Sequence, residues 1–348
     1  MSAAGAPGPV RVVRLAPAKL NLTLAVVGRR EDGYHALHSV MVPLALGDVV
    51  ALSPARVGAR GDTLRIAGLP VSPTPDNLVL KAIAATRDAV RATWRGAPND
   101  PPPLAARLTK RIPVAAGLGG GSSDAAATVA AALEAWGASL PAAAVRDLAA
   151  SLGSDVPFFL AGGAALVTGR GEVVEPLPDL EGEPPAVLLV TPRLPISTPA
   201  VFAAYAGRAR PATPAALAAS ERLVADLRAG LSVSALLARA EELSAANDLL
   251  AAALEVAPAL AGFRAALGRL LGRPVGQSGS GSSTWALYAS LADARRAARL
   301  VRVGICNGTM PAIGDGEPFV AATTILASGR HIALAGAHNG GRAISKGR

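Results

Sequence analysis

The chain has 348 residues, which is enough for one large domain or two medium domains. Hydrophobic residues make up 51% of it and charged residues 17%, a balance that is typical of an ordered globular protein and excludes an intrinsically disordered one. The formal net charge is +9, so we expect anionic partners. Because aromatic side chains are few and the arginines are scattered, we expect small phosphorylated molecules and no nucleic acid.

The sequence also argues against membrane and metal-binding proteins. No window contains about 18 uninterrupted strongly apolar residues, so we expect no transmembrane helix and no membrane partner. Met1–Pro9 lacks an apolar segment behind a basic start, which argues against a secretory signal. The single Cys306 excludes a disulfide framework, and the histidines lack the spacing of a zinc site, so we expect no metal held by protein ligands. We therefore expect a cytoplasmic protein.

Strand-forming patterns dominate the start of the chain. The segment Ala16-Pro17-Ala18 is expected to form a corner between two strands, and the polar residues 29–33 are expected to form a turn. The expected strands are Val10–Leu15, Leu20–Val26, Val40–Leu46 and Asp48–Leu52.

The following segment combines helices with one strand. Apolar residues recur at helical spacing in Asn77–Thr93, and the proline-rich stretch 96–103 can be neither helix nor strand. Leu104–Leu108 is expected to be a strand. Two Ala-rich helices follow it, Ser122–Trp136 and Pro141–Leu152.

The second half of the sequence predicts helices placed between strands. Helices are expected throughout Pro214–Leu271, with breaks at Gly230 and Pro258, and a basic helix is expected through Leu300. The expected strands are Gly162–Thr168, Ala186–Val190, Trp285–Ala289 and Phe319–Leu326. This order of elements indicates a mixed α and β protein with two lobes.

The proline-rich segment Glu175–Pro185 is the best candidate for a boundary between the lobes. We expect an N-terminal domain over residues 1–180 and a C-terminal domain over residues 181–326. Residues 327–348 are rich in Gly, Ala and Arg with little pattern, so we expect a loose tail there.

The most informative motif is the glycine-rich segment Pro113–Ser123. Its glycines allow the backbone to turn tightly and to approach an anion, and Ser122 and Ser123 open a helix whose free N–H groups attract phosphate. No lysine follows the glycines, and Ser122 occupies the position of the third glycine of G-x-G-x-x-G, so both better-known nucleotide fingerprints are excluded. The residues alone predict an anion-binding helix start or a plain glycine turn capped by serine.

Three other segments contain candidate polar groups. Lys19 lies between apolar residues, with Asn21 two positions later, and on its own it could be an edge residue with a solvated ammonium. Asp155 follows Gly153-Ser154 and could be a turn residue or a helix N-cap. The Gly-Ser run at 276–283 has the composition of a linker, but a strand-like segment follows it.

Together these motifs resemble those of the GHMP kinases. Pro113–Ser123 resembles their ATP-phosphate loop, residues 152–159 resemble their G-[SA]-D-V-P-[FV]-F segment, and Gly276–Ser283 resembles their third motif. The A-K-[LIV]-N-L segment that begins at Ala18 continues to Asp32-Gly33-Tyr34-His35. That combination resembles the signature of the diphosphocytidyl-methylerythritol kinases within the superfamily.

The resemblance implies a two-lobed α+β fold, with an N-terminal lobe like ribosomal protein S5 domain 2 and a C-terminal ferredoxin-like lobe. It implies an active site between the lobes and the ATP-dependent phosphorylation of the 2-hydroxyl of 4-diphosphocytidyl-2-C-methyl-D-erythritol, a step of the non-mevalonate isoprenoid precursor pathway. Mg²⁺ would accompany ATP and be held mainly by its phosphates. The partner is then a small-molecule substrate, and we expect a monomer or a weak homodimer.

The site residues implied by the resemblance divide by role. Lys19 and Asp155 form the catalytic pair, in which Asp155 accepts or orients the proton of the acceptor hydroxyl, and Lys19 keeps it ionised and stabilises the transferred group. Asn21 would bind the erythritol portion, while Tyr34, His35, Thr198 and Phe202 would bind towards the cytidine end. The implied ATP-binding residues are Asn77, Lys110, Pro113, Val114, Ala115, Ala116, Gly117, Leu118, Gly119, Gly120, Gly121, Ser122 and Ser123.

Two alternatives remain open on the sequence. Another GHMP small-molecule kinase, of homoserine or mevalonate type, would show no dependence on cytidine. A non-catalytic nucleotide-binding or RNA-associated protein would account for the basic charge and the S5-like lobe. The region after Leu300 is longer than the usual ending of the resembled family and could be a surface insertion.

Overall fold

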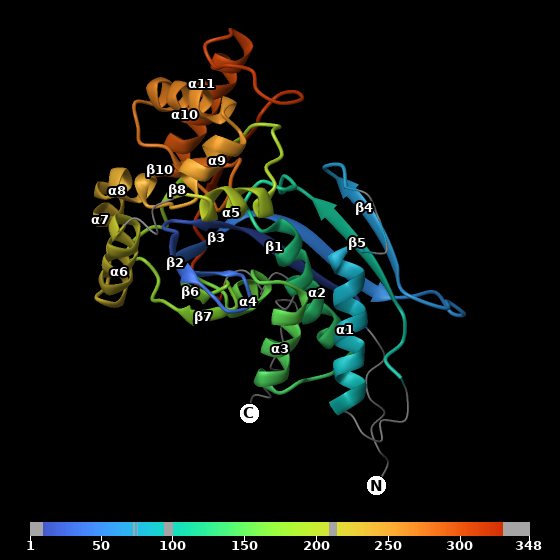
Figure 1. The fold of residues 1–348 in the computed structure, drawn as a ribbon. Coiled ribbons are helices and arrows are strands. Elements are labelled where there is room, and N and C mark those ends of the chain that lie inside the picture. Colours follow the sequence, from blue (N-terminus) through green and yellow to red (C-terminus); the bar gives the residue numbers. More distant parts are fainter. Residues whose placement is uncertain (1–9, 72–73, 75, 94–99, 209–213, 330–348) are drawn as a thin grey trace, which may run out of the picture.

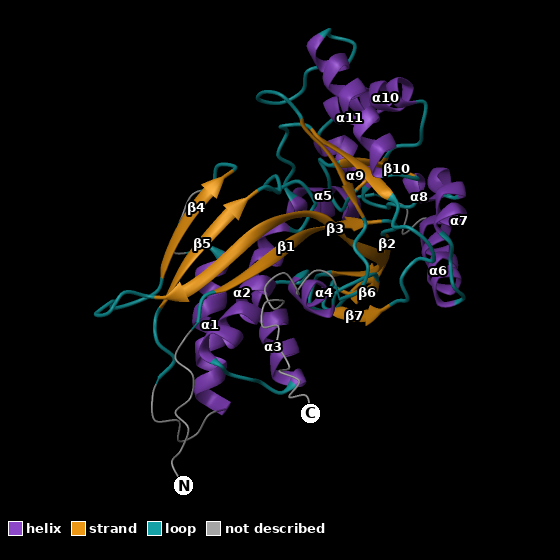
Figure 2. Cartoon of the chain, turned by 180° about the vertical axis from the view of Figure 1, so that it is seen from behind, coloured by secondary structure: helices purple, strands orange, loops and turns teal. Residues whose placement is uncertain are grey.

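The computed structural model describes residues 10–329 apart from 72–73, 75, 94–99 and 209–213. The N-terminal residues before Val10, the first part of the proline-rich stretch 96–103 and nearly all of the expected tail therefore lie outside the described residues. Figures 1 and 2 show a mixed α+β molecule in which helices pack against two sheets. Within the described residues, no helix is long and apolar enough to cross a membrane.

The larger sheet is built around one long strand, β3. The strand order is β4-β5-β3-β6-β7, and β1 and β2 also pair with β3. These strands are β1 (Val12–Asn21), β2 (Ala25–Arg29), β3 (His35–Pro54), β4 (Thr63–Gly68), β5 (Leu104–Lys110), β6 (Ala165–Gly169) and β7 (Val173–Pro176). β4 and β5 are parallel, while the other pairs are antiparallel.

Four helices lie together on one side of this sheet, as Figures 1 and 2 show. They are α1 (Leu78–Thr93), α2 (Gly120–Trp136), α3 (Ala142–Leu152) and α4 (Val156–Ala161). Ala131 and Ala135 of α2 are buried against strand residues such as Val50 and Leu52. The small alanine side chains let α2 approach the strands closely, which brings its N-terminus to the cavity described below.

The expected corner at Ala16-Pro17-Ala18 and the division of β3 into two strands are both wrong. β1 runs through Pro17 with a register shift between Pro17 and Ala18, and β3 is one strand of 20 residues. The residue expected to interrupt β1, Pro17, lies opposite Gly47, where β3 was expected to break. The two irregular positions are therefore accommodated together in one paired bulge. A Cβ on Gly47 would lie 2.8 Å from the Ala16 carbonyl oxygen, so a glycine here lets the bulged strands stay paired.

The smaller sheet has the order β11-β8-β10-β9. Its strands are β8 (Ala186–Thr191), β9 (Gly276–Gln277), β10 (Thr284–Tyr288) and β11 (Phe319–Thr324). The helices of this half are α5 (Thr198–Ala206), α6 (Pro214–Arg228), α7 (Val233–Ala238), α8 (Ala240–Ala245), α9 (Leu250–Val256), α10 (Ala259–Leu271) and α11 (Leu291–Cys306).

The helix breaks expected at Gly230 and Pro258 are confirmed, because α6 ends before the first and α10 begins after the second. The basic helix α11 extends past Leu300 to Cys306. Beyond it residues 307–318 lie mostly at the surface, where the Met310 side chain is buried and the Asp315 N–H donates to the Arg193 carbonyl at 3.1 Å.

The two sheets are joined directly. The Leu326 N–H donates to the Pro43 carbonyl at 2.8 Å, and the Leu46 N–H donates to the Thr323 hydroxyl at 2.8 Å. One apolar cluster contains both Leu44 of β3 and Trp285 of β10. We propose a division at 180/181, between β7 and β8, although the halves share this core.

Candidate active site

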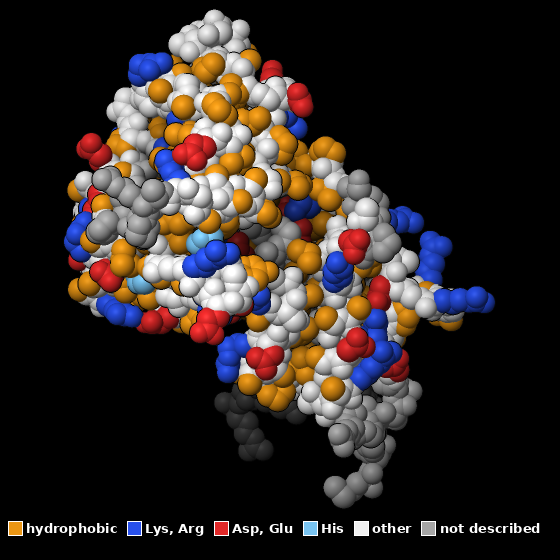
Figure 3. Space-filling view, viewed as in Figure 1, with side chains coloured by type: hydrophobic (Ala, Val, Ile, Leu, Met, Phe, Trp, Pro, Cys, Tyr) orange, Lys and Arg blue, Asp and Glu red, His pale blue; other side chains and the backbone are white. Residues whose placement is uncertain are grey.

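A cavity of about 960 Å³ lies between the two halves. It is lined by β1, the β2–β3 hairpin, the glycine segment, the start of α4 and the helix α5. Figure 3 shows a hollow near the middle of this face of the molecule, with histidine and Lys or Arg atoms close to its edge.

Lys19 and Asn21 of β1 face the same side of the strand because they are two residues apart. The Lys19 ammonium donates to the Asn21 Oδ1 at 2.5 Å, and the Asn21 Nδ2 donates to the Ser39 hydroxyl at 2.8 Å. Lys19 is only 5% exposed, so the edge-residue interpretation is wrong. Burial lowers the pKa of Lys19, and the negative charge of Asp155 opposes that shift.

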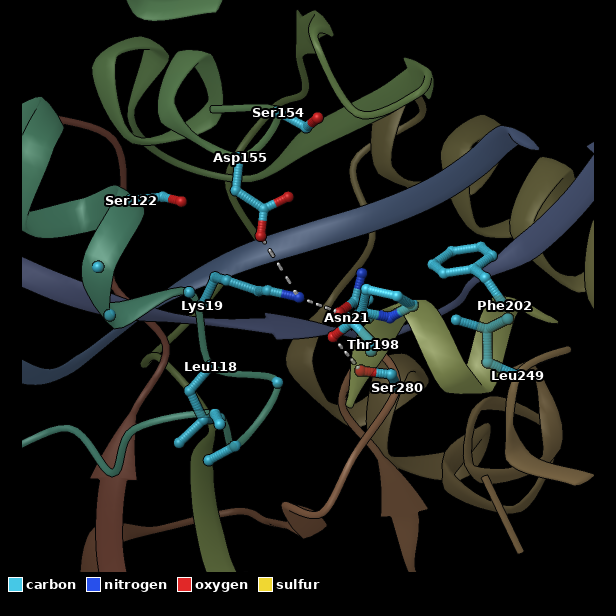
Figure 4. A pocket seen from close by; sticks show the side chains of 18 of the residues that line it. Lys19, Asn21, Leu118, Ser122, Ser154, Asp155, Thr198, Phe202, Leu249 and Ser280 are labelled. Atoms are coloured by element: carbon cyan, nitrogen blue, oxygen red, sulfur yellow. Dashed lines mark hydrogen bonds and ion pairs between the residues drawn. The ribbon is translucent and has the colours of Figure 1, made fainter. Parts of the chain in front are cut away.

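Asp155 immediately precedes α4, at the N-cap position, but its side chain makes no capping hydrogen bond. Its carboxylate lies 4.0 Å from the Lys19 ammonium, and its side chain is 30% exposed (Figure 4). The carboxylate therefore points toward the cavity with Lys19 below it. The structure does not bear out a plain helix cap.

The glycine segment wraps around the Lys19 side of the cavity. Gly117 and Gly119 have positive φ angles of 75° and 68°, and α2 begins at Gly120, two residues earlier than expected. A Cβ on Gly119 would lie 2.9 Å from Lys19 Cγ, and one on Gly117 would lie 2.2 Å from the Ser278 carbonyl oxygen. Glycine is thus required by both backbone conformation and space, and the helix N-terminus offers free N–H groups to an anion.

Lys110 lines the cavity, but its ammonium is held by two buried carboxylates. It contacts Asp48 and donates to Asp124 at 2.7 Å. Asp48 also accepts from the Ile112 N–H at 2.8 Å. The cluster therefore connects β3, β5 and the N-terminal part of α2 on both sides of the glycine segment.

The titration of this cluster reflects its charge balance. Burial raises the pKa of Asp124 to about 7, against the opposing charge of Lys110 and with the added repulsion of Asp48. Burial acts to lower the pKa of Lys110, but the two carboxylates outweigh it and raise that pKa. One lysine neutralises one carboxylate, so the second carboxyl group gains a proton near neutral pH.

The third motif reaches the site from the smaller sheet. The Ser278 hydroxyl donates to the Gly117 carbonyl at 2.9 Å, and the Ser280 hydroxyl lies 2.8 Å from the Thr198 hydroxyl. The Asn247 Nδ2 donates to the carbonyls of Gln277 and Gly279, at 3.1 and 3.0 Å. Residues 276–283 are therefore fixed by hydrogen bonds and are no flexible linker.

The expected cytidine end lies at the far side of the cavity. The ring of His35 stacks on Phe202, with centroids 5.3 Å apart, whereas Tyr34 is 55% exposed. Burial, and next the charge of Arg29, lower the pKa of His35, which favours its neutral ring. Thr198, labelled in Figure 4, and Asn77 also line the cavity, and Asn77 accepts from the Val79 N–H at the start of α1.

Residues 77–163 match the family described as GHMP kinases N terminal domain. A solved 4-(cytidine 5'-diphospho)-2C-methyl-D-erythritol kinase is 32% identical and covers 90% of this chain and 99% of its own, with a TM-score of 0.65. The 4-diphosphocytidyl-2-C-methyl-D-erythritol kinase of Paramagnetospirillum magneticum is 43% identical over 290 residues, which are 81% of this chain and 91% of that protein. This chain belongs to the 4-diphosphocytidyl-2-C-methyl-D-erythritol kinase family.

The two-lobed GHMP kinase fold expected from the sequence is confirmed by the same similarities. Other GHMP kinases share the fold at lower identity. A homoserine kinase of Cytophaga hutchinsonii is 17% identical, with a TM-score of 0.63, over 93% of this chain and 97% of its own. For that protein the likeness shows only a shared fold, whereas membership of the 4-diphosphocytidyl-2-C-methyl-D-erythritol kinase family rests on the relatives with higher identity.

All the site residues expected from the sequence except Ser123 line this one cavity. Ser123 is fully buried in α2, and its hydroxyl has no hydrogen-bond partner among the described residues. Sequence reasoning missed Asp48 and Asp124, because no local pattern pairs them with Lys110. It also missed Leu249, Arg29 and Arg170, which line the cavity together with Ser280 of the predicted third motif. For Arg170, the flanking glycines were the one available signal.

Proposed function

We propose that this chain uses ATP to phosphorylate the 2-hydroxyl of 4-diphosphocytidyl-2-C-methyl-D-erythritol. The observation that carries the proposal is the pair Lys19–Asp155, which lies beside the glycine segment in a cavity that continues to Tyr34, His35 and Phe202. The family named above is an ATP-dependent kinase family of isoprenoid biosynthesis, and its substrate has an acceptor hydroxyl at one end and a cytidine at the other.

The reaction transfers one phosphoryl group. The 2-hydroxyl oxygen forms a bond to the γ-phosphorus, the bond from that phosphorus to the bridging oxygen of ADP breaks, and the hydroxyl proton leaves. Asp155 would accept or orient that proton, a role supported by its position in the cavity lining 4.0 Å from the Lys19 ammonium. Lys19 would stabilise the negative charge on the transferred oxygens, and Asn21 holds Lys19 in place.

ATP would bind along the glycine segment. The glycines at 117 and 119 leave space that a Cβ would fill, and Gly120, Gly121 and Ser122 at the start of α2 line the cavity. These observations fit a phosphate group at the N-terminus of α2. Mg²⁺ would neutralise phosphate charge and would be held mainly by the phosphates, as no group of three potential metal-binding side chains occurs in the described part of the chain.

The cytidine would bind at the Tyr34 end. The neutral His35 ring can both donate and accept a hydrogen bond at the edge of the base, and Phe202 and Tyr34 offer faces for stacking. We further propose a cytoplasmic protein that acts as a monomer or a weak homodimer on a small-molecule substrate and does not bind nucleic acid.

The test is Asp155→Ala. We expect turnover of the diphosphocytidyl substrate to fall by about 10²–10⁴-fold, the range for loss of a general acid or base, while an ATP analogue still binds. The matched control is Asp147→Ala on the exposed surface of α3, which should leave turnover unchanged. Unchanged turnover in Asp155→Ala would refute the assigned role, and wild-type activity on homoserine or mevalonate alone would refute the substrate.

A further inference from the structure

Two arginines line the cavity together with Tyr34 and His35. Arg29 ends β2, Arg170 lies in the turn between β6 and β7, and both line the cavity. Among the described residues, neither guanidinium lies within ion-pair distance of a carboxylate, whereas Arg30 pairs with Asp32 and Glu172. The charge of Arg170 also contributes to lowering the pKa of Asp32, but without a direct ion pair. A cation that faces a cavity in this way is suited to bind an anionic ligand.

The turn that carries Arg170 is fixed next to Asp155. Gly169 and Gly171 have positive φ angles of 68° and 121°, and a Cβ on Gly171 would lie only 3.7 Å from the Asp155 Oδ1. The Arg170 N–H donates to the Glu172 carboxylate at 2.7 Å, and that carboxylate also contacts Arg30 at 3.9 Å. The turn is thereby tied to the β2–β3 hairpin.

The Arg170 side chain extends from this turn toward the opposite end of the site. Its guanidinium carbon lies 5.5 Å from the centre of the Tyr34 ring. The backbone of Arg170 therefore neighbours the group assigned to the acceptor hydroxyl, and its guanidinium neighbours the ring assigned to the cytosine. Arg170 thus lies between Asp155 and the Tyr34 ring.

We propose that Arg170 binds the diphosphate that joins the cytidine to the methylerythritol, an inference that rests on the proposed function. A planar guanidinium can donate two parallel hydrogen bonds to phosphate oxygens, which Lys19 cannot do in the same way. Lys19 is already committed to Asn21 and Asp155. Arg170 is thus a binding and specificity residue for a nucleoside diphosphate, and it takes no part in proton transfer.

The test measures the binding of cytidine and of cytidine 5'-diphosphate (CDP) by calorimetry, with a saturating ATP analogue that keeps CDP out of the ATP site. We expect Arg170→Ala to weaken CDP binding by roughly tenfold to a hundredfold, the range for lost charge-assisted hydrogen bonds, and to leave cytidine binding unchanged. The CDP affinity of Arg170→Lys should lie between that of the unmodified protein and that of Arg170→Ala. In turnover, KM for the diphosphocytidyl substrate should rise with little change in kcat.

The matched control is Arg146→Ala, an exposed arginine of α3 outside the cavity, which removes the same charge and should leave CDP binding unchanged. Equal losses of CDP and cytidine binding in Arg170→Ala would indicate that Arg170 only supports Tyr34, and would overturn the proposal. Wild-type affinity for CDP in Arg170→Ala would also overturn it while leaving the proposed kinase intact. A wild-type protein that neither binds CDP nor phosphorylates the diphosphocytidyl substrate would overturn both.

Discussion

The Lys19 ammonium lies in a buried environment that disfavours its charged form. It is almost fully buried, so burial lowers its pKa below the ordinary lysine value of 10.5, and only Asp155 opposes this shift. The proposed reaction needs the protonated form, because only an ammonium can stabilise negative charge on the transferred group. The charge of this residue should therefore be lost at a lower pH than that of a surface lysine.

We predict that kcat declines on the alkaline side with a midpoint below 10.5, as Lys19 loses its proton. Lys19→Arg should be slower, because a guanidinium fits the Asn21 contact poorly, but its rate should lack this alkaline decline, since arginine stays protonated. The measurement is kcat from pH 6 to 10 at saturating ATP. An identical alkaline decline in both proteins would assign it to another group.

The catalytic pair could be found from the sequence, while its surroundings could not. Lys19 and Asp155 stand in short recognisable motifs, and both line the cavity. Whether Asp155 caps a helix or faces a ligand depends on the direction of its side chain, which sequence does not encode locally. Arg170 has no motif, and its relation to Tyr34 arises only when the β6–β7 turn meets the β2–β3 hairpin.

Among the elements, the glycine segment has the strictest steric requirement. Gly117 has a φ of 75°, and an added Cβ would lie 2.2 Å from a backbone oxygen of Ser278, which cannot move like a side chain. The contact also links the N-terminal half to the third motif, because Ser278 donates to the Gly117 carbonyl. A substitution of Gly117 would disturb both the glycine segment and its contact with Ser278, which connects the two halves of the molecule.

We predict that Gly117→Ala lowers the free energy of unfolding by about 1–3 kcal/mol and weakens the binding of an ATP analogue at least tenfold. The control is Gly262→Ala in α10, where an added Cβ meets nothing within 4 Å. That change should be neutral or stabilise the protein by up to about 1 kcal/mol, because alanine favours helix. Thermal and urea unfolding with calorimetric binding would compare the two. Equal effects would contradict the steric explanation.

Element types were easier to predict than element limits. The alanine-rich pattern predicted helix α2, and Gly230 and Pro258 themselves predicted the helix breaks. Both predictions depend only on residues that are neighbours in the sequence. The continuity of β1 depended on Gly47 lying opposite Pro17, a pairing between distant residues. β4, β7, α4 and α5 were not expected, because short elements owe their formation mainly to tertiary contacts.

For the whole molecule, the cluster of Lys110, Asp48 and Asp124 links folding to pH. The pKa of Asp124 is raised to about 7 by burial, so the folded protein holds a proton that the unfolded chain releases at its ordinary pKa of 3.8. The stability that the protonated Asp124 contributes is fully present below pH 3.8, where both the folded and the unfolded chain hold the proton. It is lost as the pH rises from about 4 through 7.

We predict that the free energy of unfolding of the unmodified protein falls between pH 4 and 8 relative to that of Asp124→Asn. The asparagine cannot ionise, so this variant lacks the proton that the folded protein holds on Asp124. Urea unfolding at several pH values measures the difference, and Asp147→Asn on the exposed face of α3 should follow the unmodified protein. Parallel curves for Asp124→Asn and the unmodified protein would contradict the raised pKa.

The hydrogen bonds between the sheets also set an order of events during protein synthesis. Asn21 leaves the ribosome 257 residues before Ser278, whose side-chain hydroxyl accepts a hydrogen bond from the Asn21 N–H. The hydrogen bond from the Leu326 N–H to the Pro43 carbonyl can form only after Leu326 has been synthesised, which is later still. The nascent N-terminal lobe therefore exposes part of β3 and an incomplete phosphate loop until nearly all of the described chain has been translated. We therefore expect that nucleotide can bind only late in synthesis, once residues 276–283 have joined the glycine segment.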